Sequence, residues 1–206
     1  MSWIASPEGS EGARADYERP ADWYGWQPDE LGHSVDLTLA LVRTDHVAIA
    51  LVGAYAGSAG AMLFLHWAFR RQDLDAGSWA RFHDLAHADP DEVSNEEERL
   101  TAEVLLADGT STSTAAHFQH DRQPAGLVFS DYFGRSTSGS KERIHGRTKL
   151  WLHPLPPLPT LDLTVAWPAV GVPPTTVTLP TAAILEAGLR SEWIWPDDAD
   201  LQERQH

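Results

Sequence analysis

Four histidines are the residues of this chain best suited to binding a metal ion. His83 and His87 are four residues apart in a segment with helical periodicity, so both imidazoles project from one side of the predicted helix. His117 and His120 supply two more imidazoles further along the chain. Imidazoles at such spacings can bind zinc or nickel without thiolates. A metal-dependent hydrolase using these four histidines is therefore an alternative hypothesis, although Asp84 stands where the zincin motif requires glutamate. The competing interpretation is surface histidines that hydrogen-bond to the acidic residues after the helix.

A second candidate site consists of aromatic residues near the N-terminus. Trp23, Tyr24 and Trp26 lie close together in an otherwise polar segment. Exposed together, their rings would form a platform for a sugar, which makes a carbohydrate-binding sandwich a further alternative. Rings in a polar segment more commonly pack onto the body of a domain, because burying them is the segment's only source of order.

Catalytic chemistry finds little support in the rest of the sequence. The chain contains no cysteine, which excludes a thiol nucleophile, a disulfide and a zinc–thiolate site. It also lacks the Gly-x-Ser-x-Gly motif in which many hydrolases present their serine. We therefore predict no catalytic residue, no required cofactor and a non-enzymatic function.

The charge of the chain constrains its partners. Fifteen Lys and Arg stand against 30 Asp and Glu, for a net charge of −15. Affinity for nucleic acid and for anionic lipid surfaces rests largely on Lys and Arg, so neither is expected as a partner. Electrostatic complementarity instead favours a basic protein partner. The favoured interpretation is an acidic binding or assembly module.

The apolar residues of the N-terminal half follow the period of β-strands. Residues 35–42, 47–53 and 62–67 alternate between the two faces of a strand, and flexible residues at 57–60 separate the last two runs. Residues 47–69 also lack any formally charged side chain and are long enough for a transmembrane helix. The period of two and the central turn favour adjacent strands of an antiparallel meander, and hence a soluble protein.

The remaining residues predict more short strands and two helices. One helix is expected to begin at Ser78, which would cap it, and the other at Pro180 and Thr181. A polar loop is expected at residues 135–146. Further strands are predicted at 100–106, 127–133, 149–152, 161–167 and 175–179. The absence of regular β–helix–β alternation predicts a mainly β fold, an antiparallel β-sandwich of about eight to nine strands with two short helices.

The chain divides by composition into three parts. Residues 1–30 form an irregular arm that bears aromatic residues, residues 31–196 a single sandwich domain, and residues 197–206 an acidic tail. The first residues have neither the basic nor the apolar stretch of a secretory signal, so a cytoplasmic location is expected. The buried tryptophans of the sandwich are expected to be Trp67, Trp79, Trp151 and Trp167.

Several segments together resemble a family of uncharacterised actinobacterial proteins. They are residues 39–51, 151–157 and 163–169, together with the Trp-Pro pairs at 167–168 and 195–196, which are the most distinctive part. The likeness covers most of residues 35–196. It implies a soluble, β-rich domain, and it implies no activity, cofactor or site residue.

Overall fold

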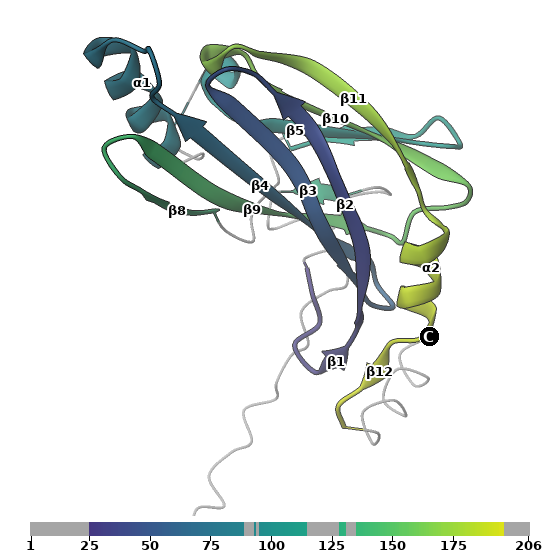
Figure 1. Cartoon of the computed structure of the whole chain (residues 1–206). Coiled ribbons are helices and arrows are strands. Elements are labelled where there is room, and N and C mark those ends of the chain that lie inside the picture. The colour runs from purple at the N-terminus through teal and green to yellow at the C-terminus, as the bar shows by residue number, and fades with distance from the viewer. Residues whose placement is uncertain (1–24, 89–92, 94, 115–127, 131–134, 196–206) are drawn as a thin grey trace, which may run out of the picture.

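A computed structural model describes residues 25–88, 93, 95–114, 128–130 and 135–195 of the chain (Figure 1). Two α-helices are described, α1 (Ala76–His87) and α2 (Ala182–Leu189), with short 3-10 turns at Glu96–Glu98 and Pro168–Val170. The strands are β1 (Glu30–Leu31), β2 (His33–Arg43), β3 (Val47–Ala56), β4 (Ala61–Arg70), β5 (Thr101–Leu106), β6 (Ser111–Ser113), β7 (Val128–Ser130), β8 (Arg135–Gly139), β9 (Arg143–His153), β10 (Thr160–Trp167), β11 (Val172–Pro180) and β12 (Glu192–Trp193).

The strands form three antiparallel sheets, which confirms the predicted mainly β fold. The larger sheet has the order β2-β3-β4-β9-β7, with β8 also paired to β9, and the second has the order β11-β10-β5-β6. These two sheets lie one behind the other in Figure 1 and give a sandwich-like arrangement. β1 and β12 pair as a small third sheet. The structure has more strands than the eight or nine expected, because β1, β6, β7 and β12 are only two or three residues long.

One apolar core holds the two large sheets together. The indole of Trp67 on β4 meets that of Trp167 on β10 edge to face, with ring centroids 5.5 Å apart. Phe69 contacts both the Trp167 ring and the Phe82 ring of α1, which fixes that helix at one end of the sheet. All four tryptophans predicted to be core residues are buried: Trp67, Trp79, Trp151 and Trp167.

The predicted hairpin is confirmed. Residues 57–60 connect β3 to β4, which pair in register from Val47↔Phe69 to Ala56↔Ala61. The register shifts between Leu51 and Ala54, where Gly53 has a φ of 143° that a residue with a side chain rarely adopts. In the described part of the chain, no helix is long and apolar enough to cross a membrane.

The start of α1 differs from its prediction. Asp75, not Ser78, caps the helix, and its carboxylate accepts hydrogen bonds from the backbone N–H groups of Gly77 and Ser78. Ser78 lies inside the helix and donates its hydroxyl to the same carboxylate at 2.8 Å. Aspartate caps helices as well as serine does, so the residue type of Ser78 alone could not establish it as the cap.

The predicted loop at residues 135–146 is wrong. This segment contains β8 and the first residues of β9, joined by a turn at residues 140–142. Within β9, the exposed Arg143 and His145 alternate with the buried Ile144 and Gly146. The segment is extended because β9 hydrogen-bonds along its whole length to β4, from Arg143↔Arg70 to Leu152↔Ala61. The polar composition of this segment therefore led to a loop prediction, although the segment includes part of a central strand with one solvent-facing side.

Candidate anion-binding site

The predicted metal-binding histidines are only partly described. His83 and His87 lie on one side of α1, as predicted, with ring centroids 4.3 Å apart and nearly parallel planes. The Nδ1 atom of His87 is 2.8 Å from the carbonyl oxygen of His83, which leaves Nε2 as its free ring nitrogen. His117 and His120 lie outside the described residues. Among the residues that are described, no three His, Asp or Glu side chains are grouped as metal ligands.

The predicted aromatic platform is likewise only partly described. Trp23 and Tyr24 lie outside the described residues. Trp26 is half-buried, and its ring packs 4.5 Å from Tyr55 and 6.4 Å from Trp151, centroid to centroid. This ring therefore belongs to a small apolar cluster on the outer face of the larger sheet.

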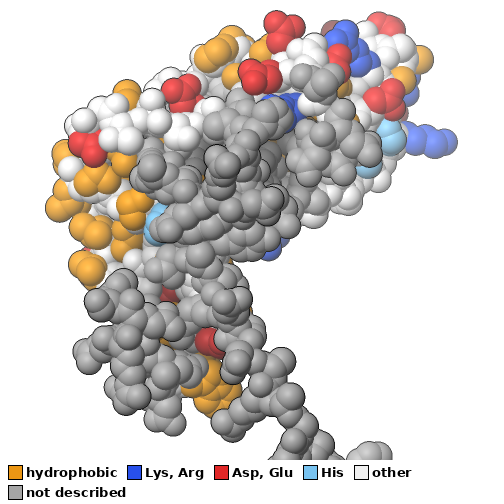
Figure 2. Space-filling view, turned by 180° about the vertical axis from the view of Figure 1, so that it is seen from behind, with side chains coloured by type: hydrophobic (Ala, Val, Ile, Leu, Met, Phe, Trp, Pro, Cys, Tyr) orange, Lys and Arg blue, Asp and Glu red, His pale blue; other side chains and the backbone are white. Residues whose placement is uncertain are grey.

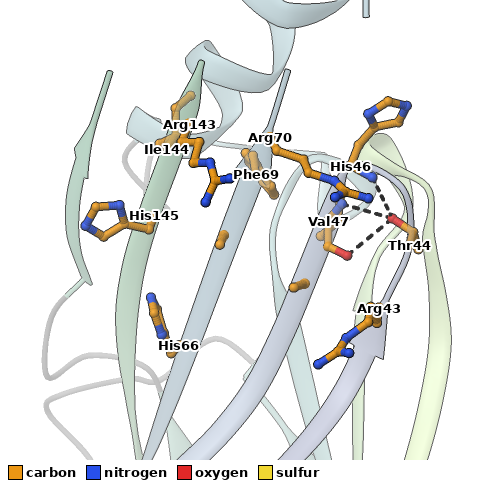
Figure 3. A pocket seen from close by; sticks show the side chains of 12 residues that line it. Arg43, Thr44, His46, Val47, His66, Phe69, Arg70, Arg143, Ile144 and His145 are labelled. Atoms are coloured by element: carbon orange, nitrogen blue, oxygen red, sulfur yellow. Dashed lines mark hydrogen bonds between the residues drawn. The ribbon is translucent and has the colours of Figure 1, made fainter. Parts of the chain in front are cut away.

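A pocket of about 580 Å³ lies on the same outer face, towards the other end of the strands (Figure 3). Six of the side chains around it are basic: Arg43, Arg70, Arg143, His46, His66 and His145. No Asp or Glu is among the described residues that line it. We call it the cationic pocket. In a chain with a net charge of −15, such a grouping of basic side chains identifies the pocket as a candidate site for an anion.

Cross-strand pairing brings these side chains together. Directly opposed residues of an antiparallel sheet share a face, so each row of pairs runs across neighbouring strands. One row across β2, β3, β4 and β9 consists of Arg43, Ala48, Ala68 and His145. The next row consists of Ala40, Ala50, His66 and Arg147. Basic residues thus stand at the β9 side of both rows, and Arg43 stands at the β2 side of the first.

The turn between β2 and β3 shapes the upper wall of the pocket. The Thr44 hydroxyl accepts a 2.9 Å hydrogen bond from the backbone N–H of Val47, and the Thr44 N–H donates to the Val47 carbonyl at 2.8 Å (Figure 3). At this turn Arg70 donates from Nε to the carbonyl oxygen of Asp45, and its NH2 is 4.0 Å from the Asp45 carboxylate. Arg70 is therefore held in place by the chain itself.

Several other cations at the pocket have no acidic partner. In the part of the chain that the structure describes, no ion pair joins a carboxylate to Arg43 or Arg143 of the pocket, or to Arg147 beside it on the same face. In Figure 3 the Arg43 and Arg143 side chains reach over the sheet from opposite sides of the pocket. A guanidinium without a carboxylate partner keeps its donors and its charge available for a ligand.

The pKa of His66 also reflects the positive potential of this face. Partial burial lowers the pKa of His66, and the charges of Arg147 and His145 lower it further. The His66 and His145 rings meet edge to face with centroids 6.2 Å apart. A histidine whose pKa is lowered by neighbouring cations lies in a field that favours a bound anion.

The His46 ring points away from the centre of the pocket (Figure 3). His46 contacts Asp73 through Nε2 at 3.5 Å, but its Nδ1 is buried and has no hydrogen-bond partner among the described residues.

Ser138 and His145 form a hydrogen-bonded pair beside the pocket, with Oγ 2.8 Å from Nε2. Such a pair resembles half of a catalytic triad, which also needs a carboxylate at the opposite ring nitrogen. No such carboxylate contacts His145 in the described ranges. We therefore assign Ser138 the role of orienting the imidazole towards β8.

The outer face of the second sheet has the opposite character. There Thr176, Thr164 and Glu103 stand in one row, and Asp162 accepts a 2.6 Å hydrogen bond from Thr178 in the next. Figure 2 shows the molecule from that side, with Asp and Glu side chains spread over its upper part. The two sheets thus separate the basic side chains of the pocket from much of the acidic charge.

The sequence prediction missed this site because its residues were assigned to a loop or to different strands. A signal was present in the alternation of residues 143–150, where every second residue is basic. That pattern is typical of a strand with one buried face, and it would have placed Arg143 and His145 on a common surface.

The chain matches no protein-family profile, no curated protein and no solved structure. The resemblance of residues 35–196 to a family of actinobacterial proteins therefore stays a prediction.

Proposed function

We propose that this chain is a non-enzymatic binding domain whose cationic pocket takes a small anionic ligand. The observation that carries the proposal is the convergence of Arg43, Arg143 and His66 on one pocket that no described acidic residue lines. Guanidinium groups bind carboxylates and phosphates through paired, charge-assisted hydrogen bonds, which are about twice as strong as neutral ones.

The size of the pocket and the net charge of the chain support a small ligand over a polymer. A volume of about 580 Å³ is typical of sites for small molecules. A long polyanion would extend beyond the pocket and meet the field of a chain with a net charge of −15. The proposal therefore agrees with the sequence prediction that nucleic acid is not a partner.

Inorganic phosphate is the simplest probe of the proposal. We expect phosphate to shift the NMR signals of His66 and His145, and the substitution Arg143→Gln to weaken its binding about tenfold, because a hydrogen bond to a charged group is lost. The matched control is Arg81→Gln on α1, whose exposed guanidinium is 3.9 Å from Glu98 and away from the pocket. Equal binding by both variants, or shifts spread evenly over the molecule, would refute the proposal.

The predicted basic protein partner is a second candidate function, and a groove on the second sheet is where it would bind. The groove has a volume of about 320 Å³, and its lining includes Glu96, Glu97 and Glu103 but no Lys or Arg among the described residues. We expect Glu103→Gln combined with Glu97→Gln to reduce capture of basic proteins at low salt. A pull-down that recovers only neutral or acidic proteins would argue against this function.

A further inference from the structure

The floor of the cationic pocket is made of alanines. Ala48 and Ala68 line the pocket and oppose each other across β3 and β4. Ala50 extends this floor into the next row, beside the pocket on the same face of β3. Val52, which is 42% exposed, continues this apolar strip along β3. On the outer face of the second sheet, one row of pairs instead carries Thr176, Thr164 and Glu103.

These alanines leave a flat surface of molecular size. Neighbouring strands are about 4.8 Å apart, and residues two apart on one strand are about 6.8 Å apart. The three methyl groups therefore span an area close to that of one or two fused six-membered rings. A side chain longer than alanine at any of these positions would stand up from the sheet and fill the space.

Basic residues flank this floor. Arg43 stands on β2 and His145 on β9, three strand spacings or about 14 Å apart at the backbone. Arg143 reaches inwards from the β9 side (Figure 3). Guanidinium planes stack on aromatic rings in addition to pairing with anions, so the same side chains can contact both parts of an aromatic anion.

We infer that the ligand is a flat aromatic anion, whose ring system lies on Ala48, Ala50 and Ala68 while its carboxylate or phosphate binds the flanking arginines. This inference rests on the proposed function, since it assigns a chemical class to the ligand of the same pocket. An inorganic ion would fill only a small part of the pocket and leave the apolar floor exposed to water. A flat ring covers it and gains the free energy of burying apolar surface on both partners.

Matched ligands and variants test separately whether the rings contact the floor and whether the anionic group contacts the arginines. The ligands are 2-naphthoate, acetate, inorganic phosphate and the neutral 2-naphthalenemethanol, with dissociation constants measured by NMR titration. We expect naphthoate to bind at least about tenfold more tightly than acetate, because its rings bury apolar surface on the floor. The neutral alcohol is expected to bind at least about tenfold more weakly than naphthoate, because it lacks the anionic group.

Larger side chains on the alanine floor should weaken binding of the aromatic ring and leave binding of the anionic group nearly unchanged. Ala68→Leu and, independently, Ala48→Leu are expected to weaken naphthoate binding about tenfold while changing phosphate binding less than about twofold. Ala166→Leu is the matched control, because Ala166 is a half-buried alanine on the outer face of β10. It should change neither affinity, and thermal unfolding identifies any variant that fails to fold.

The outcomes distinguish this inference from the proposed function. If phosphate binds at the pocket but naphthoate binds no more tightly than acetate, the aromatic class is wrong and the anion site stands. If naphthoate binds equally well to the wild type and to both floor variants, its rings lie elsewhere and the inference is overturned. If no anion shifts the signals of His66 and His145, both the inference and the proposed function are wrong.

Discussion

Trp67 and Gly146 face each other across β4 and β9, and the indole occupies the space that a side chain at residue 146 would need. A Cβ built on Gly146 would overlap Cζ2 of Trp67 and crowd the carbonyl oxygen of Ser136. This close contact lies on the inner face of the sheet. Because neighbours in a strand point to opposite faces, His145 and Arg147 point outwards, on the face that carries the cationic pocket.

We predict that Gly146→Ala lowers the free energy of unfolding by about 1–3 kcal/mol, the usual cost of overpacking a core. Neither the Trp67 indole nor the backbone of β8 can move away without disturbing the contact with Trp167 or the strand pairing. Chemical denaturation measures the change. Gly77→Ala in the first turn of α1 is the control, since its nearest neighbour there is the flexible Asp75 carboxylate and the change should stay within about 1 kcal/mol. Equal stability of the two variants would contradict the packing argument.

The substitution Arg147→Gln should raise the pKa of His66 in the free protein. The Arg147 charge is the second largest cause of the lowered pKa, after burial, so its removal leaves burial and His145 as the remaining causes. An NMR titration of the His66 ring protons measures the shift. Arg81→Gln on α1 serves as the control, and an unchanged pKa in the Arg147→Gln variant would show that the two side chains do not interact.

Anion binding should be linked to proton uptake at His66. Without ligand, its pKa lies below the ordinary value of 6.5. A bound anion stabilises the imidazolium and raises this pKa, so affinity should increase as pH falls through the range in which His66 takes up a proton. Phosphate is a poor probe here, because it changes its own charge near neutral pH; sulfate is used instead. His66→Gln should flatten the pH dependence, whereas His83→Gln on α1 should leave it unchanged. Tighter binding at higher pH would contradict the linkage.

The capping residue Asp75 should make the stability of the protein depend on acid pH. Hydrogen bonds from Ser78, and then from Gly77, lower the pKa of its carboxyl below 3.8 in the folded state. The stabilisation is therefore complete above that ordinary value and is lost as pH falls through the lower folded pKa. We expect Asp75→Ala to have a lower melting temperature than the wild type at pH 7, with the difference shrinking towards pH 2. Asp75→Asn keeps the cap without titrating, so its melting temperature relative to Asp75→Ala should not depend on pH in this range. A difference between wild type and Asp75→Ala that persists at pH 2 would rule out the carboxylate as its cause.

Local patterns alone determined the mainly β class, the β3–β4 hairpin and the buried tryptophans. In each case the information lies within a few neighbouring residues: a period of two, a flexible turn, or a large apolar ring on the buried side of a strand. The same rules failed for residues 135–146, where polar side chains and Gly146 are equally compatible with a loop. The pairing of β9 with β4 decided between these possibilities, because it supplies hydrogen bonds that the segment cannot make by itself.

The candidate site depended entirely on the tertiary structure. Arg43, His66 and Arg143 come from three different strands, and Arg43 and Arg143 are 100 residues apart in the chain. The total charge of the chain favoured a basic partner. It could not predict the cationic pocket, because composition does not show where each charge lies. Strand order and register place basic side chains on one face of the larger sheet and acidic ones on the outer face of the other. Only that arrangement gathers basic side chains on one face of a negatively charged chain, and with them a candidate site for an anion.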